Sequence, residues 1–219
     1  LHSDMASTSQ GQGVRFLTPT GNVGVRNDTR GSYILYVGAL EPRKNIEGLI
    51  TAFEHLNTPS PRVGEGGGEG LVIAGLSTSY TKKLKQRIAR SRAREKIEVI
   101  ENPDEEEKHA LYAGASLFVY PSFYEGFGFP PLEAMAAGVP VVASSAAAVS
   151  EICGDAALLV SPWKIDEIKE GVRILLDDEE LRKRYISAGH ARVQAFSWDE
   201  CAKQVYTLFL ASSDKGFRK

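Results

Sequence analysis

Two glutamates, Glu125 and Glu133, flank a short glycine-containing loop. Residues 116–120 precede the loop, and their β-branched and aromatic side chains are typical of a buried strand. Pro130 and Pro131 come after it, and proline fits the first turn of a helix, where the backbone N–H is unpaired anyway. Glu125 is therefore predicted in a loop at the carboxyl end of a strand, and Glu133 in the first turn of the next helix. Carboxylates in these places flank the crevice where open α/β sheets bind ligands.

The same loop offers backbone donors to an anion. Gly126 and Gly128 let the backbone approach a ligand closely, and the N-terminus of the following helix carries a positive partial charge that suits a phosphate. The two prolines remove two donors, so the predicted donors are the amides of residues 126–129, Leu132 and Glu133. Local chemistry also fits a second interpretation, an ordinary strand–loop–helix turn in which Glu133 caps its own helix.

A second loop, residues 38–45, follows an apolar run and contributes Arg43 and Lys44. A third, residues 144–149, is built of small residues. In a parallel sheet the carboxyl ends of the strands share one edge, so we expect the three loops to meet there. Cations and helix-end amides suit a di- or triphosphate, while carboxylates suit sugar hydroxyls. A nucleotide that carries a sugar satisfies all of them; the alternative is that Arg43 and Lys44 form a solvated helix entry.

The rest of the chain alternates strands and helices, which indicates a parallel sheet wrapped by right-handed crossovers. We predict an α/β fold: a Rossmann-like parallel sheet of about six strands with helices on both faces and C-terminal helices packing at one side. The predicted strands are residues 33–37, 71–75, 97–100, 116–120, 139–143 and 157–160. The predicted helices begin at Ile46, Tyr80, Asn102 (as cap), Pro130, Ile165, Glu179 and Trp198, the Tyr80 helix running to Arg94.

Domain organisation follows from the same pattern. Residues 32–219 are expected to form one nucleotide-sugar-binding domain, and residues 1–31 a linker or vector-derived tail. Because the chain begins with Leu1, we expect a fragment or a processed product. The glycine-rich stretch 64–70 lacks the spacing of a phosphate loop and precedes a strand, so it is predicted to be a surface connection.

Composition excludes several classes of function. Apolar content of 42%, charged content of 25% and a net charge of -2 fit a soluble globular protein and give no reason to expect nucleic acid or an anionic membrane as partner. The basic helix that begins at Tyr80 lacks interleaved aromatics, which favours a solvated face. Cys153 and Cys201 are too few and too far apart for a disulfide scaffold or a zinc site and indicate reduced thiols in a cytoplasmic protein.

Five segments together resemble a known family, the retaining glycosyltransferases of family 4, also called group 1, which have the two-domain GT-B fold. The resemblance covers roughly residues 33–211. It rests on Tyr-Val-Gly-Ala-Leu-Glu-Pro-Arg-Lys-Asn at 36–45, Leu-Val-Ile-Ala-Gly at 71–75, Ala-Leu-Tyr-Ala at 110–113, the long segment at 120–144 with its E-x7-E spacing, and Gly-Asp-Ala-Ala at 154–157. It implies the C-terminal, donor-binding domain of such an enzyme.

The resemblance also implies roles for individual residues. Lys44 corresponds to the cation on the donor diphosphate, with Arg43 beside it, and Glu125 to the carboxylate on the donor sugar. Glu133 corresponds to the carboxylate on the ribose hydroxyls. The substrate-binding set is completed by Gly38 and the loop around the first glutamate: Gly126, Phe127, Gly128, Phe129 and Leu132. One departure is Ala39, where many members have arginine; either Arg43 compensates or the diphosphate is held less tightly.

The implied reaction moves a hexose of the mannose or glucose type from a nucleotide diphosphate sugar, GDP- or UDP-linked, to a glycan or lipid-linked acceptor. No D-x-D stands at a strand end, so we expect no metal and no cofactor. The acceptor site belongs to an N-terminal domain for which this chain has no room. We therefore expect the chain to bind the donor but to be inactive alone, and to reach a membrane only through that domain.

Three other interpretations stay open. The chain could be a stand-alone nucleotide-sugar binding or assembly module that works with a separate acceptor-domain protein. It could belong to the non-hydrolysing sugar-nucleotide epimerases, although the acid/base residues of those enzymes are not evident. A flavodoxin-like redox domain fits the topology, but no redox cysteine pair supports it.

Overall fold

The computed structural model describes residues 32–56 and 70–214. Their centre is a six-stranded sheet in the order β3-β2-β1-β4-β5-β6, in which every neighbouring pair is parallel. The strands are β1 (Tyr33–Val37), β2 (Gly70–Gly75), β3 (Ile97–Glu101), β4 (Leu117–Tyr120), β5 (Val141–Ser144) and β6 (Leu158–Val160). The order reverses between β1 and β4, which makes this the switch point where open α/β sheets bind ligands at the carboxyl ends of their strands.

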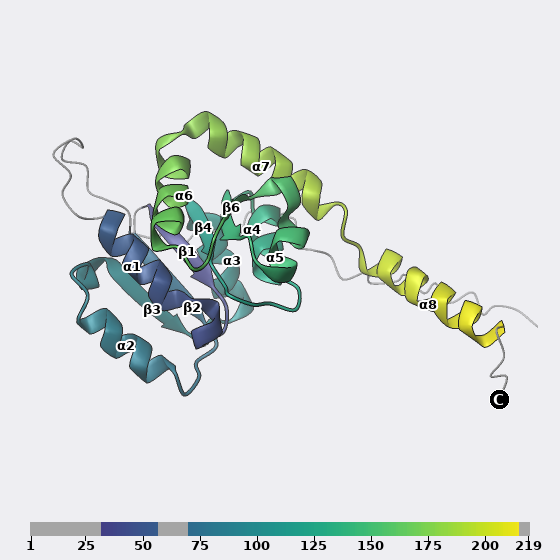
Figure 1. The fold of residues 1–219 in the computed structure, drawn as a ribbon, viewed down its shortest axis with the longest axis horizontal. Helices are drawn as coiled ribbons and strands as arrows, with labels where there is room; N and C mark the ends of the chain where they lie inside the picture. Colours follow the sequence, from purple (N-terminus) through teal and green to yellow (C-terminus); the bar gives the residue numbers. More distant parts are fainter. Residues whose placement is uncertain (1–31, 57–69, 215–219) are drawn as a thin grey trace, which may run out of the picture.

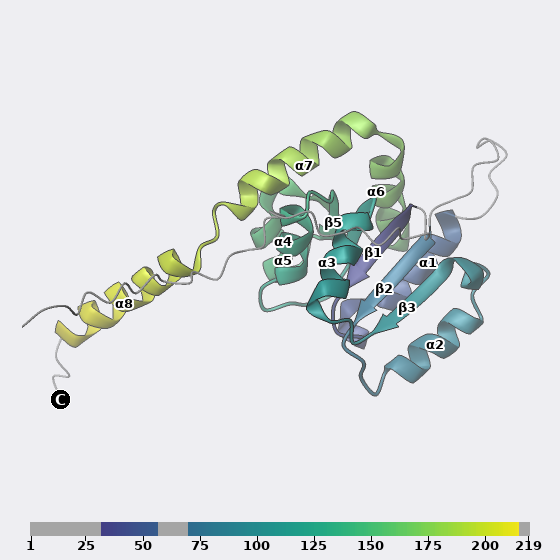
Figure 2. The same cartoon turned by 180° about the vertical axis from the view of Figure 1, so that it is seen from behind.

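Helices cover both faces of the sheet, as predicted. They are α1 (Ile46–Leu56), α2 (Thr81–Ala89), α3 (Glu105–Gly114), α4 (Phe129–Ala136), α5 (Ala147–Cys153), α6 (Ile165–Asp177), α7 (Glu179–Val193) and α8 (Trp198–Asp214). Figure 1 shows α1 and α6 on one face, and Figure 2, from behind, shows α3, α4 and α5 on the other. None of the helices in the described ranges is both long and apolar enough to cross a membrane.

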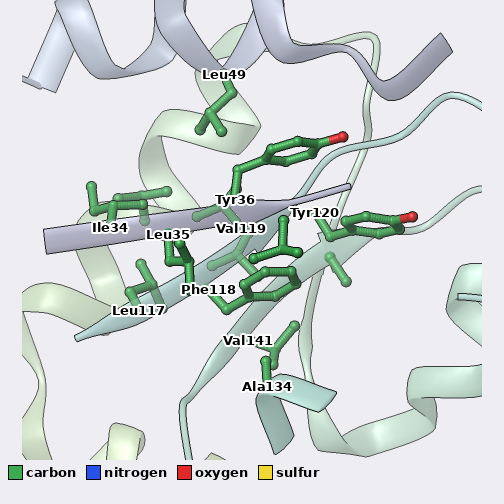
Figure 3. Close-up of a cluster of buried hydrophobic side chains, with 14 of the residues drawn as sticks. Ile34, Leu35, Tyr36, Leu49, Leu117, Phe118, Val119, Tyr120, Ala134 and Val141 are labelled. Carbon is green, nitrogen blue, oxygen red and sulfur yellow. The ribbon is translucent and has the colours of Figure 1, made fainter. Parts of the chain in front are cut away.

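All six predicted strands are present, with ends shifted by at most two residues, and the inner strands β1, β2, β4 and β5 are buried on both faces. Every residue of β1 and of β4 is buried. Figure 3 shows how the two faces are filled: Tyr36 lies on the side of Leu49 of α1, and Phe118 on the side of Ala134 of α4. A strand with helices on both sides reads as a continuous hydrophobic run rather than an alternating one, and that run made these strands visible in the sequence.

The predicted end of the Tyr80 helix and the predicted cap of the Asn102 helix are wrong. The helix from Tyr80 ends at Ala89 instead of Arg94, because the next two amides, of Arg90 and Ser91, bond back only three residues and tighten the last turn. The cap before α3 is Asp104 instead of Asn102: Asp104 and Glu107 form a capping box, and Asn102 Oδ1 accepts from the amide of Ser77.

Three further expectations meet the structure differently. The loop predicted at residues 144–149 is shorter, because α5 already begins at Ala147. Helices α6 and α7 pack against the body at one side, but α8 extends away from it and its described side chains are exposed (Figure 1). The tail 1–31 and nearly all of the glycine-rich stretch lie outside the described residues.

An ion pair between Glu54 and Arg87 joins α1 to α2. The Arg87 guanidinium donates to both carboxylate oxygens of Glu54, at 3.0 and 2.7 Å. This fork lowers the pKa of Glu54 from 4.5 to about 2. Because the folded-state pKa is depressed, the stabilisation is present above about pH 4.5 and is lost as the pH falls toward 2.

We expect Arg87→Met to lower the free energy of unfolding by about 1–3 kcal/mol at neutral pH. The loss should shrink on acidification, because protonated Glu54 no longer needs the guanidinium. Urea denaturation between pH 7 and pH 2.5 measures both effects. Arg173→Met removes an exposed pair on α6 and serves as control; equal losses in the two variants would show that the α1–α2 pair has no special weight.

Candidate active site

Two loops meet at the switch point between β1 and β4. After β1, the chain runs through a short 3₁₀ turn, Pro42–Lys44, and after β4 it runs from Pro121 to Gly128. The backbone of Arg43 accepts from the amide of Phe123 at 2.9 Å. Asn45 takes a left-handed conformation, φ 56°, and its side-chain amide donates to the carbonyl of Pro121 at 3.1 Å. The predicted meeting of these two loops is therefore confirmed.

The charged side chains of the two loops converge on Glu125. Lys44 Nζ lies 2.6 Å from Glu125 Oε1, and Arg43 Nη1 lies 2.9 Å from Oε2. The Lys44 and Glu125 side chains are each 8% exposed, whereas Arg43 is 46% exposed. The interpretation of Lys44 as a solvated helix entry is wrong, since it is a buried cation with a buried counter-ion. Arg43 lies on the exposed side of this cluster and also pairs with Glu41.

The environment keeps the Glu125 carboxyl ionised. Burial alone favours its neutral form, but hydrogen bonds from Lys44 and Tyr120 outweigh burial and hold the pKa of Glu125 below its ordinary value. The Tyr120 hydroxyl lies 2.9 Å from Oε1 of the same carboxylate. Ser122 Oγ is fully buried and has no hydrogen-bond partner within the described residues.

Sequence reasoning missed Tyr120 and Ser122. Tyr120 ends a buried apolar strand, where a tyrosine reads as core, and only the position of its hydroxyl distinguishes it. Its alternation with Phe118 along β4 is consistent with core packing and gives no further signal. Ser122 was part of the loop segment but carried no specific pattern.

The loop after Glu125 leads into α4 one residue earlier than predicted. Gly128 is the N-cap with φ 126°, and α4 begins at Phe129. Counted from the Gly128 cap, Leu132 and Glu133 are the fifth and sixth residues, so their amides belong to the helix ladder. The Leu132 side chain is buried in the core. The donors that face the loop are those of residues 126–129, so Leu132 is a weaker candidate than the sequence suggested.

Glu133 lies in the second turn of α4, not the first, and contacts a different set of partners from Glu125. The Tyr112 hydroxyl of α3 donates to Glu133 Oε2 at 2.8 Å, and Lys108 Nζ lies 3.8 Å from Oε1. Glu133 is 34% exposed. The helix-capping interpretation of Glu133 does not hold, because Gly128 is the cap. The carboxylate is held from the side by α3 and keeps an accessible edge.

Gly38 begins the first loop and packs tightly. Its amide donates to the carbonyl of Ala74 at 3.0 Å. A Cβ at Gly38 would lie 2.8 Å from the Tyr36 hydroxyl, so a packing reason for glycine exists here without any ligand.

An open hollow of about 590 Å³ lies between α2 and the end of β3. It is lined by Ser77, Thr78, Thr81, Lys82, Lys85, Gln86, Ala89 and Glu101. None of these residues belongs to the Glu125 cluster. No group of three or more His, Cys, Asp or Glu side chains suited to a metal ion occurs in the described part of the chain.

The fold and the site together define a Rossmann-like α/β domain with a cluster of charged side chains at its topological switch point. Residues 24–192 match the family described as "Glycosyl transferases group 1". The chain therefore belongs to the group 1 glycosyltransferases. The O-antigen chain mannosyltransferase B of Escherichia coli is 37% identical over 177 residues, covering 81% of this chain and 45% of the mannosyltransferase.

Solved structures agree with this assignment. The C-terminal domain of a glycosyl transferase group 1 family protein from Francisella tularensis superposes with a TM-score of 0.64 at 27% identity, covering 75% of this chain and 86% of that domain. Sucrose-phosphate synthase from Thermosynechococcus elongatus gives a TM-score of 0.72 at 25% identity, covering 86% of this chain and 47% of the synthase. The chain thus spans about half the length of the full-length mannosyltransferase and synthase.

Proposed function

We propose that this chain is the donor-binding half of a retaining glycosyltransferase that transfers a hexose from a GDP- or UDP-linked donor. The observation that carries the proposal is the convergence of Lys44 and Arg43 on Glu125 at the switch point. Two cations and a carboxylate at one crevice match a ligand that carries both a diphosphate and sugar hydroxyls. The name of the Escherichia coli relative supports a mannose donor and polysaccharide biosynthesis.

The chemistry follows from where charge develops. Breaking the sugar–phosphate bond builds negative charge on the leaving diphosphate, so a fixed ammonium there stabilises the transition state more than the ground state. In the proposed complex Lys44 and Arg43 turn from Glu125 to the diphosphate. The amides of residues 126–129 add backbone donors. Glu125 then accepts from the sugar hydroxyls, and Glu133 from the ribose, with no metal or cofactor in the scheme.

The acceptor is proposed to bind to a second domain. The chain spans 45% of the mannosyltransferase relative, and a cleft between two domains excludes water from the transfer better than one open face. We infer that the described half binds the donor and turns over little by itself. A stand-alone binding module that works with a separate acceptor-domain protein is the alternative, and co-purification with such a protein separates the two.

Calorimetric titration with UDP-glucose, GDP-mannose and ADP-glucose tests the donor site. We expect one of the first two to bind, and Glu133→Gln to weaken both the nucleotide sugar and the free nucleoside diphosphate about tenfold, because each carries the ribose. Glu180→Gln on α7, 84% exposed, is the matched control and should bind as the wild type does. No heat with any of these donors would contradict the proposal.

A further inference from the structure

The hydroxyl of Tyr120 occupies the point where the two buried charges meet. It lies 3.0 Å from Lys44 Nζ and 2.9 Å from Glu125 Oε1. An ammonium can only donate and a carboxylate can only accept, so the single O–H of the phenol points to Glu125 and its lone pair faces Lys44. Lys44 and Glu125 therefore fix the direction of the Tyr120 hydrogen bond at every pH at which both are charged.

The Tyr120 ring cannot follow a moving partner. The residue is 1% exposed, at the end of the central strand β4. Its ring stacks on Tyr36 with centroids 6.1 Å apart and on Phe118 with centroids 6.0 Å apart. Figure 3 shows the hydroxyls of Tyr36 and Tyr120 pointing the same way, beyond the strands. Arg43 differs, because it is half-exposed and can swing to a ligand.

We propose that Tyr120 is a positioning residue that keeps the Glu125 carboxylate in place when Lys44 and Arg43 turn to the diphosphate. This inference rests on the proposed function. In the structure Glu125 is held by both cations and by the phenol. When a bound nucleotide sugar draws both cations to its diphosphate, the phenol of Tyr120 is left as the fixed hydrogen-bond donor to the buried Glu125 carboxylate. Without that bond the carboxylate would lose its orientation toward the sugar at the moment it is needed.

The ionisation of the surrounding groups agrees with this role. Burial, and after it the nearby Glu125 charge, raises the pKa of Tyr120, so the phenol stays protonated and remains a donor. The Tyr120 hydrogen bond in turn lowers the pKa of Glu125. The other polar or charged groups that act on the pair are Lys44, Arg43, Ser122, Tyr36 and, beyond Arg43, Glu41.

The test compares Tyr120→Phe with Tyr33→Phe. Tyr33 lies on the adjacent strand β1, is equally buried, and donates to the carbonyl of Leu111 at 2.8 Å, so its variant loses a buried hydrogen bond away from the charges. With ¹³C-labelled glutamate, the Glu125 signal is assigned by its loss in Glu125→Gln and titrated by NMR. We expect Tyr120→Phe to raise the proton affinity of Glu125 about tenfold, one pKa unit, and Tyr33→Phe to leave it unchanged.

Donor binding supplies the second readout. Tyr120→Phe should weaken the nucleotide sugar about tenfold, the scale of one hydrogen bond to a charged group, and weaken the matching nucleoside diphosphate far less, because both cations remain. Equal weakening of the two ligands, or an unchanged Glu125 titration in a chain that binds the donor, overturns the role of Tyr120 alone. A wild-type chain that binds neither ligand overturns the proposed function, and this role with it.

Discussion

Replacing Lys44 with methionine is expected to destabilise the fold and abolish donor binding together. The Glu125 carboxylate, which is only 8% exposed, loses its buried ammonium partner in this variant. Removing one partner of a buried pair costs about 3–5 kcal/mol, because the remaining charge is uncompensated. Arg43 and Tyr120 still reach this carboxylate, so we expect the lower end of that range. Urea denaturation and calorimetry with the nucleotide sugar measure the two effects.

The double variant Lys44→Met/Glu125→Gln separates stability from function. With both charges gone, no buried ion is left unpaired, so most of the lost free energy of unfolding should return. Donor binding should not return, because Lys44, the proposed cation on the diphosphate, and Glu125, the proposed carboxylate on the sugar, are both replaced. Lys183→Met, from an exposed pair on α7, controls for the loss of a lysine. A double variant as unstable as the single one would show that the pair is not energetically coupled.

The pH dependence of the same variants has a definite sign. Glu125 has a depressed pKa in the folded chain, so the stabilisation by its partners is present above the ordinary carboxyl pKa and is lost as the pH falls through the depressed value. The stability difference between wild type and Lys44→Met should therefore shrink on acidification. If the stability difference between wild type and Lys44→Met stays constant into strong acid, it arises from the packing of the lysine's aliphatic chain and not from the ion pair.

The inner strands β1, β2, β4 and β5 were predictable because strands that are buried on both faces have largely apolar sequences. Helix ends were less predictable where two residues compete for one role. Asn102 and Asp104 are both good caps, and the structure selects Asp104 because Asn102 has φ 52° and bonds to Ser77 instead. The C-terminal helices were predicted to pack at one side, but the described side chains of α8 face solvent.

The site was predictable as far as topology determines it. Two loops that follow neighbouring parallel strands lie at the same edge of the sheet. This rule predicted that Lys44 and Glu125 lie close together. The ion pair between Lys44 and Glu125 was not predicted. Their roles were inferred for contacts with a bound nucleotide sugar, whereas without a ligand the two side chains pair with each other. The Tyr112 contact that holds Glu133 depends on where the crossover helix α3 docks, which no local pattern reveals.

Gly75→Ala is expected to damage both the sheet and the site, through one backbone contact. Gly75 ends β2 beside the start of the first loop, and a Cβ there would lie 1.7 Å from the carbonyl oxygen of Gly38 and 2.6 Å from its carbon. The obstacle is backbone, so no side chain can turn aside. The strands are also pinned on either side: the Gly38 amide donates to Ala74 at 3.0 Å, and the carbonyl of Gly75 accepts from Asn102 at 2.9 Å.

Relief of this clash requires the carboxyl ends of β1 and β2 to separate, which breaks ladder hydrogen bonds and moves the loop that carries Lys44. Overpacking against side chains costs about 1–3 kcal/mol, and we expect the cost here to lie at about 3 kcal/mol or above, with donor affinity falling at least tenfold as Lys44 is displaced. Gly70→Ala, at the other end of β2, meets its nearest atom only at 3.6 Å and should change neither quantity. Denaturation and calorimetry on both variants measure the two effects. If Gly75→Ala behaves like Gly70→Ala, the ends of β1 and β2 can separate at little cost. The position of the first loop then does not depend on this glycine.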